Sequence, residues 1–140
     1  MKILLKNGAC VHQTKIGLNS PLMHAAYKGD LVTTNILLEQ HVDVNWKGVK
    51  SVTALMSAGA NNHENIVRLL LENEADPDAV DFYGNTLLRC TIELKLLNIA
   101  EILLTYGANI HIKKKGLTVL DEAIDQKNKD ALRLLFKYGA

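Results

Sequence analysis

The sequence predicts an all-α solenoid, in which short helix-turn-helix units stack side by side and β-turn fingers project between them. Two observations support this prediction. Leucine supplies 23 of the 140 residues, whereas Phe, Trp and Tyr together supply 7, a balance that favours helices packed through aliphatic side chains over an aromatic-rich sheet. The chain also repeats with a period of 32 or 33 residues, and periods of this length are typical of stacked repeat proteins.

The repeat has two markers. A Ser or Thr is followed two positions later by Leu, and a pair of large apolar residues comes 17 positions after the hydroxyl residue. The first marker comprises Ser20/Leu22, Thr53/Leu55, Thr86/Leu88 and Thr118/Leu120, and the second comprises Leu37-Leu38, Leu70-Leu71, Leu103-Leu104 and Leu135-Phe136. One array is therefore expected over the whole chain, 1–140, with units at 15–47, 48–80, 81–112 and 113–140 and a half unit at 1–14 that carries Leu4-Leu5.

Each unit is expected to hold two short antiparallel helices. The first helix begins after the hydroxyl residue, which can cap free backbone N–H groups, and Pro21 suits the first helical position. Gly29 or Asn62 then tolerates the left-handed backbone of the turn that follows. The second helix lies at about 31–38 and 66–71, where apolar residues recur at helical spacing.

Further glycines mark the ends of the units. Gly8, Gly107 and Gly139 follow the second helices as C-terminal caps, and Gly84 and Gly116 mark tight turns that lead to the next unit. No unit of this size can bury its helix faces alone, so the units must stack.

The pattern resembles the ankyrin repeat family. The residues that carry the resemblance are Ser20-Pro21-Leu22-Met23-His24-Ala25-Ala26, Gly29, Asp43-Val44-Asn45, Thr53-Ala54-Leu55, Asn62-His63, Ile66-Val67, Leu69-Leu70-Leu71, Ala75-Asp76-Pro77-Asp78, 81–86, Gly107-Ala108-Asn109-Ile110 and 116–120. The match covers the whole chain in four units that keep the same phase. The resemblance implies the ankyrin repeat solenoid and a non-catalytic protein-protein interaction module.

The chain departs from the family pattern at two kinds of position. The histidine that starts the family's first helix is replaced by Met23, Met56, Arg89 and Asp121, so its turn-bracing hydrogen bonds are not expected and the turns are expected to be looser. Family glycines are replaced after the second helix and between the helices, by His41, Glu74, Lys95 and Lys127. Each of these residues, if held at positive φ, is expected to cost roughly 1 kcal/mol.

Composition excludes several classes of partner. Sixteen basic and 15 acidic residues give a formal net charge of +1, so no overall field attracts nucleic acid or an anionic membrane. Polar residues interrupt every apolar run well before the roughly 18 residues of a membrane span. Cys10 and Cys90 are too few and too far apart for a disulfide framework, which favours free thiols and an intracellular setting, cytoplasmic or nuclear. We expect a monomer and, because the pattern is cut at both ends, a fragment of a longer protein.

Metal and catalytic sites are not expected. The five histidines, His12, His24, His41, His63 and His111, are dispersed without the spacing of metal ligands. The acidic run Asp121, Glu122 and Asp125 suits the start of a helix, and stacked helix pairs offer a shallow groove in place of an enzyme's cleft. The run Lys113-Lys114-Lys115 is interpreted as a solvated turn tip. A fragment of a nuclear import signal and a phosphate contact are the less favoured alternatives. The chain is therefore predicted to be no enzyme and to need no cofactor.

The resemblance implies a binding surface, because ankyrin partners usually lie along the concave face made by the turn tips and the first helices. The residues predicted to bind a partner there are Tyr27, Lys28, Trp46, Val49, Lys50, Val52, Asn61, Phe82, Tyr83, Asn85, Glu93, Lys114, Lys115 and Asp125. Ile16, Asn19, Lys47, Ala60, Leu94, Leu117 and Gln126 map to the same face.

Three functions remain open at this point. The first is binding of a peptide or a folded protein in the concave groove, with exposed aromatics as anchors. The second is a small-molecule or oligonucleotide receptor that stacks a ring on Tyr83 or Trp46 and holds phosphate near Lys50 or Lys114. The third is a structural spacer in a larger protein. Trp46 and Phe82 could also serve only to pack neighbouring turns together.

Overall fold

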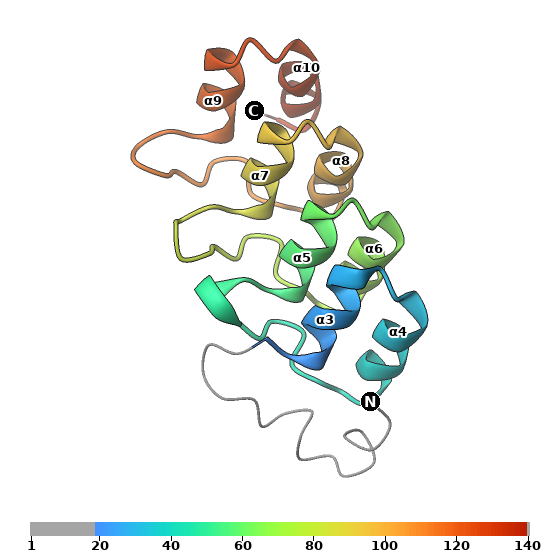
Figure 1. Cartoon of the computed structure of the whole chain (residues 1–140). Helices are drawn as coiled ribbons and strands as arrows, with labels where there is room; N and C mark the ends of the chain where they lie inside the picture. Colours follow the sequence, from blue (N-terminus) through green and yellow to red (C-terminus); the bar gives the residue numbers. More distant parts are fainter. Residues whose placement is uncertain (1–18, 140) are drawn as a thin grey trace.

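A computed structural model describes residues 19–139 of the chain. Within this range the protein is all-helical, with four antiparallel helix pairs in two layers (Figure 1). The first helices are α3 (Pro21–Lys28), α5 (Ala54–Ala60), α7 (Leu87–Glu93) and α9 (Val119–Asp125), and the second helices are α4 (Leu31–Glu39), α6 (Glu64–Glu72), α8 (Leu97–Thr105) and α10 (Lys129–Lys137). The predicted solenoid of stacked helix pairs is confirmed. The half unit at 1–14, with Leu4-Leu5 and Gly8, lies outside the described residues, as do Cys10, His12 and Ile16.

The hydroxyl residues cap the first helices as the repeat predicts. Backbone N–H groups of Met23, Met56, Arg89 and Asp121 donate to the side-chain oxygens of Ser20, Thr53, Thr86 and Thr118 over 3.2–3.3 Å. At the last cap the Asp121 carboxylate also accepts from the Thr118 backbone N–H at 2.9 Å. This backbone hydrogen bond, helped by one from the Thr118 hydroxyl, holds the pKa of Asp121 below its ordinary value. The stability that the Asp121 carboxylate adds to this cap is therefore lost as the pH falls through that lowered pKa.

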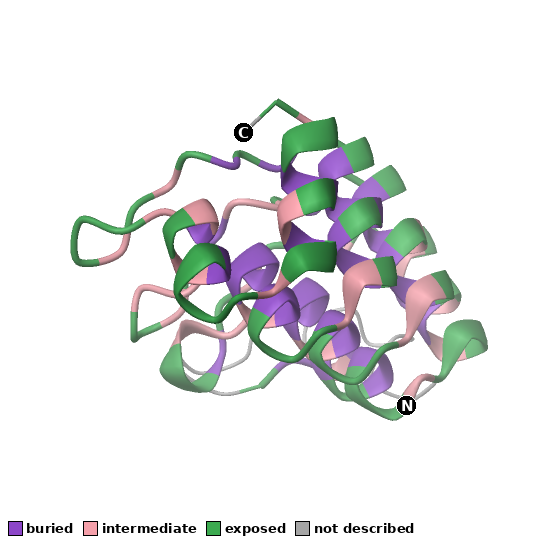
Figure 2. Cartoon of the chain, turned by 90° about the horizontal axis from the view of Figure 1, so that it is seen from above, coloured by how far each residue is buried: buried purple, intermediate pink, exposed green. Residues whose placement is uncertain are grey.

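The core lies between the two helix layers, where the inner faces of all eight described helices are buried (Figure 2). The first residue of each apolar pair is the centre of this core: Leu37, Leu70, Leu103 and Leu135 each have a relative exposure of 0%. The leucine marker in the sequence thus identified the packing register of the second helices. The boundaries of the units between these helices stay predictions.

The predicted non-glycine residues do occupy left-handed backbone positions. His41, Glu74, Lys95 and Lys127 have φ values of 56°, 70°, 59° and 55°. Asn62, at φ 60°, lies between the two helices of the second unit, as Lys95 and Lys127 do in the third and fourth units. Each of these residues directly follows the C-cap of a helix. The chain has to reverse there, so the fold accepts a local cost of about 1 kcal/mol at each position.

Two of the turn tips are tight hairpin turns. In the tip around η1 (Val49–Ser51), Lys50 and Ser51 are both left-handed, at φ 56° and 58°, and the Val52 N–H donates to the Val49 carbonyl at 3.2 Å. In the tip at 113–117, Lys115 and Gly116 have φ 52° and 79° between the hydrogen-bonded partners Lys114 and Leu117. This is the geometry of type I′ turns, which ordinarily favours Asn or Gly at both central positions. The first of these tips is strained because it has neither residue.

Ser51→Gly is expected to raise the free energy of unfolding by about 1 kcal/mol, because glycine adopts positive φ without steric cost. Urea unfolding followed by circular dichroism measures the change. The matched control is Ser57→Gly, inside α5, where the same substitution should lower stability by about 0.5 kcal/mol through added backbone freedom. A Ser51→Gly variant no more stable than the parent would contradict the strain.

Candidate interaction surface

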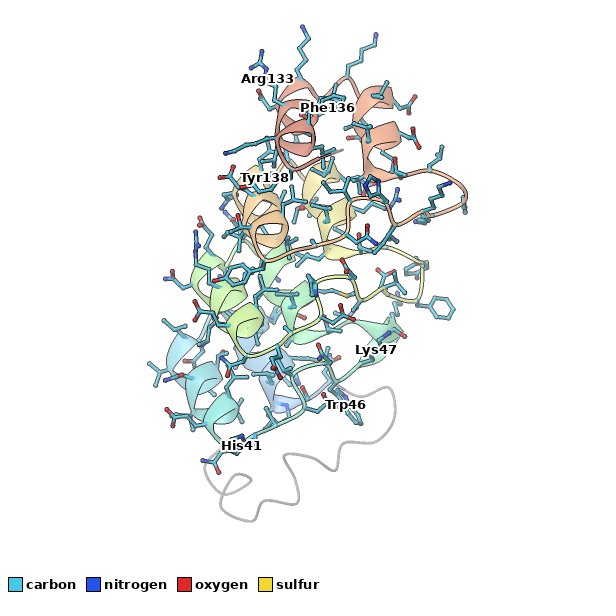
Figure 3. All side chains as sticks on the ribbon, turned by 180° about the vertical axis from the view of Figure 1, so that it is seen from behind. His41, Trp46, Lys47, Arg133, Phe136 and Tyr138 are labelled. Carbon is cyan, nitrogen blue, oxygen red and sulfur yellow. The ribbon has the colours of Figure 1, made fainter. Side chains whose placement is uncertain are left out.

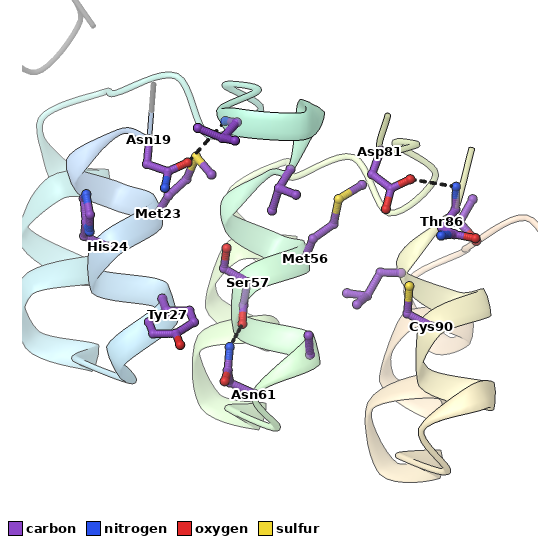
Figure 4. A pocket seen from close by; sticks show the side chains of 15 residues that line it. Asn19, Met23, His24, Tyr27, Met56, Ser57, Asn61, Asp81, Thr86 and Cys90 are labelled. Atoms are coloured by element: carbon purple, nitrogen blue, oxygen red, sulfur yellow. Dashed lines mark hydrogen bonds between the residues drawn. The ribbon is translucent and has the colours of Figure 1, made fainter. Parts of the chain in front are cut away.

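An apolar groove runs across the first helices on the side of the turn tips (Figure 4). Its volume is about 500 Å³. It is lined by Asn19, Met23, His24 and Tyr27 of the first unit, by Val49, Val52, Met56, Ser57, Ala60 and Asn61 of the second, and by Asp81, Asn85, Thr86, Leu87 and Cys90 of the third. The groove therefore spans α3, α5 and α7, which no single unit could provide.

The floor of the groove is made of flexible thioethers. Met23 and Met56 are 4% and 9% exposed and stand at the same position of α3 and α5. Unbranched Met side chains adapt to irregular shapes, and such surfaces accept varied apolar side chains. Tyr27 stands at the rim with 62% of its surface exposed. The floor thus favours an apolar group from a partner.

Few charges line the groove. Its lining includes one carboxylate, Asp81, and neither Lys nor Arg. The Oδ1 atom of Asp81 accepts hydrogen bonds from the backbone N–H groups of Tyr83 and Asn85, each at 2.9 Å. The Asn61 amide donates to the Ser57 carbonyl at 2.7 Å. These polar groups hold their own turns and helices, so the groove presents a mainly apolar interior.

Phe82 and Tyr83 form an exposed aromatic pair at the third turn tip. Their rings meet edge to face, with centroids 5.4 Å apart, and they are 74% and 55% exposed. The Lys50 ammonium lies 5.6 Å from the Tyr83 ring centroid, and the Phe82 N–H donates to the Lys50 carbonyl at 2.8 Å. The second and third tips are therefore joined, although both aromatic side chains remain accessible.

Comparison with known proteins identifies the class of this array. Residues 1–81 match the family profile described as "Ankyrin repeats (3 copies)". The chain belongs to the ankyrin repeat family. It is 30% identical over 128 residues to the putative ankyrin repeat protein FPV034 of fowlpox virus (strain NVSL), covering 88% of this chain and 30% of that protein. It is 33% identical over 155 residues to the putative ankyrin repeat protein L86 of Acanthamoeba polyphaga mimivirus, covering 92% of this chain and 27% of that protein.

A third relative is an ion channel homolog by name. The chain is 28% identical over 140 residues to the Caenorhabditis elegans homolog of the transient receptor potential cation channel subfamily A member 1, covering 99% of this chain and 12% of that protein. The ankyrin chain thus spans less than a third of each of these relatives. Within residues 19–139 no helix is long and apolar enough to cross a membrane.

The ankyrin surface predicted from the sequence is spread over three places in the structure. Tyr27, Val49, Val52, Asn61 and Asn85 line the groove. Lys50, Phe82, Tyr83, Lys114 and Lys115 lie at the turn tips, and Lys28, Glu93 and Asp125 lie at the exposed C-terminal ends of first helices. The groove brings together only the first of these three sets. Binding by any of these residues stays a prediction.

Trp46 differs from the other predicted aromatics. It is half-buried and packs against the hydrophobic core, at the opposite end of the array from Arg133 and Phe136 of α10 and from Tyr138, which follows α10 (Figure 3). Trp46 therefore contributes to the core, whereas the Phe82 side chain is 74% exposed. Whether either residue serves only to pack neighbouring turns together stays a prediction.

Arg89 was expected to leave its turn looser than in other ankyrin repeats, and that expectation is wrong. The side chain is 2% exposed, and Nη2 donates to the carbonyls of Leu117 at 2.8 Å and Ile112 at 3.4 Å. Nη1 forms an ion pair with the Glu122 carboxylate of α9. Arg89, which belongs to α7, thus holds the turn at 112–117 in place. Glu122 was expected only to interact with the dipole of its helix, and it also pairs with Arg89.

His63 links the first two described helix pairs. Its Nε2 donates to the Tyr27 carbonyl at 3.1 Å, and its ring lies so close to Gly29 that a Cβ there would be 2.7 Å from Cε1. The structural role predicted for His63 fits this position. Among residues 19–139 no group of three or more His, Cys, Asp and Glu side chains could hold a metal ion.

Sequence reasoning missed Met23, Met56 and Cys90 as groove residues. Their position in the sequence could have identified them. Each is the third or fourth residue of a first helix, close to the N-cap at the end of the helix that adjoins the turn tips. Cys90 is a half-buried free thiol, and burial is the main cause that raises its pKa above the ordinary value.

Cys90 is expected to alkylate slowly with iodoacetamide, because the thiolate is the reacting form and a raised pKa reduces its fraction. In a Cys10→Ser chain, which isolates Cys90, the rate should rise with pH through a midpoint higher than that of the same chain in urea. Mass spectrometry measures the labelled fraction over time. Equal midpoints in the folded and unfolded chains would contradict the predicted shift.

Proposed function

We propose that this ankyrin array is a non-catalytic interaction module that holds a peptide or a folded protein on its concave surface. Ankyrin repeats generally mediate protein-protein interaction and are generally non-catalytic. The observation that supports the location is the apolar groove of about 500 Å³, because its lining contains Tyr27, Val49, Val52, Asn61 and Asn85, which the sequence assigned to partner binding.

The exposed aromatic pair adds an anchor beside this groove. Phe82 and Tyr83 are held by a turn whose backbone is fixed by the Asp81 carboxylate and by the Lys50 carbonyl. Binding interfaces concentrate their energy in a few such side chains, since aromatic groups bury a large area at a small cost in conformational entropy. The turn also presents them ready-formed, which lowers the cost of ordering on binding.

Phe82→Ala and Tyr83→Ala should each weaken binding by at least thirtyfold, or about 2 kcal/mol, while the fold is retained. The measurement is a titration of each folded variant against a partner recovered by affinity capture with the parent chain. The matched controls are Arg68→Ala and Glu101→Ala, exposed residues of the second helices, which should change affinity less than threefold.

The opposite pattern would place the partner elsewhere. If the aromatic variants bind like the parent and Arg68→Ala or Glu101→Ala abolishes binding, the partner uses the second-helix face. If no substitution on either face changes binding, the array is a spacer. Binding of an oligonucleotide that weakens steeply with salt would instead favour the receptor alternative.

A further inference from the structure

The turn tips carry a local positive charge that the chain as a whole does not show. We define the tip row as residues 46–52, 81–86 and 113–118. It contains five of the 16 basic residues, namely Lys47, Lys50, Lys113, Lys114 and Lys115, against one acidic residue, Asp81. The chain as a whole has a formal net charge of only +1. The tip row therefore concentrates positive charge, which favours an anionic partner.

The five lysines of the tip row fall into two sets, which differ in whether they contact a neighbouring tip. Lys114 donates to the Asn85 side chain at 2.8 Å, and Lys50 lies over the Tyr83 ring. Both link neighbouring tips. Lys47, Lys113 and Lys115 are exposed and are not engaged with a neighbouring tip in this way, so their ammonium groups are open to a partner.

The carboxylates of Asp81 and Asp121, at the third and fourth tips, are occupied locally. The Asp81 carboxylate accepts two backbone hydrogen bonds within its own turn. The Asp121 carboxylate accepts from the backbone and the hydroxyl of Thr118. Lys113 lies close enough to lower the pKa of Asp121, so it is partly compensated, whereas within residues 19–139 neither Lys47 nor Lys115 forms an ion pair. Glu93 and Asp125 lie at the far ends of their helices.

Apolar groups lie between the two lysine clusters. Phe82 and Tyr83 occupy the third tip, with Val49 on one side and Leu117 on the other, all of them exposed. The order along the tip row is thus basic, aromatic, basic. A complementary segment would carry carboxylates on both sides of an apolar residue.

We propose that the tip row and the adjoining groove bind an acidic peptide segment, in which Asp or Glu residues flank an apolar side chain. This inference rests on the proposed function and specifies the chemistry of the partner. Stacked helix layers lie about 10 Å apart, so the second and fourth tips are about 20 Å apart. An extended peptide rises about 3.3 Å per residue, which places the two acidic groups about six residues from each other.

Two other anionic partners fit the structure less well. A membrane surface would meet the lysines and aromatics but could not fill the groove beside them, whereas a peptide side chain can. Single-stranded nucleic acid could stack a base on the exposed Phe82 ring, but it carries no aliphatic side chain to fill the apolar groove over Met23 and Met56. A peptide with both carboxylates and an apolar side chain uses every feature of this surface.

The test is selection of phage-displayed random 12-residue peptides on the immobilised full chain. Selected sequences should be enriched in Asp and Glu on both sides of an apolar residue. A fluorescein-labelled synthetic copy of the most enriched peptide is then titrated against the parent and two triple variants. Lys47→Glu/Lys113→Glu/Lys115→Glu should bind at least tenfold more weakly, and the affinity of the parent should fall as salt is raised from 50 to 500 mM.

The matched control carries the same change in charge at two turns between helices and at the first residue of α10. It is Lys95→Glu/Lys127→Glu/Lys129→Glu, three exposed residues away from the tip row, and it should bind within twofold of the parent. Glutamate is tolerated at positive φ in this fold, as Glu74 shows, so both variants should keep the circular dichroism spectrum of the parent.

The outcomes separate this inference from the function on which it rests. Selected peptides without acidic enrichment, whose binding still requires Phe82 and Tyr83, would overturn the acidic chemistry and leave the interaction module intact. If no peptide is selected whose binding depends on the groove, both the acidic-peptide inference and peptide binding by the proposed module are overturned. Binding of phosphatidylserine vesicles or of single-stranded DNA that exceeds peptide binding would also overturn the acidic-peptide proposal.

Discussion

Arg89→Ala is expected to lower the free energy of unfolding by about 3 kcal/mol, at the lower end of the range for breaking a buried ion pair. The substitution removes a guanidinium that is 2% exposed and leaves the Glu122 carboxylate, whose side chain is 23% exposed, without its cation. It also leaves the Leu117 and Ile112 carbonyls without the Nη2 donor. Partial access of water to Glu122 limits the loss. Urea unfolding measures it.

A double-mutant cycle separates the charge of Arg89 from its volume. Arg89→Met keeps much of the packing of the aliphatic stem, and Glu122→Gln removes the charge that would be left unpaired. The Arg89→Met/Glu122→Gln variant should therefore be more stable than Arg89→Met alone, by 1 kcal/mol or more if the pair is coupled as the structure indicates.

A loss below about 1 kcal/mol in Arg89→Ala would show that the buried pair does not hold the turn.

Leu70→Ala is the second large effect, with an expected loss of about 2 to 5 kcal/mol. Leu70 is fully buried between the second helices, and a rigid stack cannot collapse completely around the cavity that the substitution leaves. Denaturant unfolding gives the change in midpoint and in slope. The control is Leu94→Ala, the same substitution at a residue that is 56% exposed, which should cost less than about 0.5 kcal/mol.

A small effect at Leu70 would have a specific meaning. If Leu70→Ala loses less than 1 kcal/mol, the leucine pairs do not mark the packing register of the array. Leu37, Leu103 and Leu135 occupy equivalent positions, so Leu103→Ala serves as an independent repeat of the same test.

The sequence predicted those parts of the fold that depend on short-range chemistry repeated at a fixed interval. A capping hydroxyl needs only the N–H groups two or three residues later, so Ser20, Thr53, Thr86 and Thr118 could each be assigned locally. The buried leucines followed from the same period. The left-handed positions of Glu74 and Lys95 were also predictable, because a turn between helices needs positive φ whatever residue stands there.

The candidate site was less predictable, because its contacts join residues about 30 positions apart. The bond from Phe82 to Lys50 and the bond from Lys114 to Asn85 depend on how neighbouring tips approach each other. The unit pattern says where a tip lies but not which side chains meet across tips. Arg89 could be recognised from the sequence as a departure from the family pattern. Its contacts with the next turn could not be predicted, because they too depend on how neighbouring units approach each other.

The contact of Arg89 with the fourth tip also bears on how the array opens. In a stacked repeat each helix pair contacts only its neighbours, so local opening of a pair has to break those contacts. Here the hairpin at 113–117 and the helix α9 are both fastened to α7 by one buried side chain. Local opening of the last helix pair must therefore break a buried charge contact, so α7, this hairpin and α9 should exchange their amide protons as one cooperative block. Lys113 and Lys115 then keep a fixed position relative to Phe82 and Tyr83 through the smaller motions of the chain.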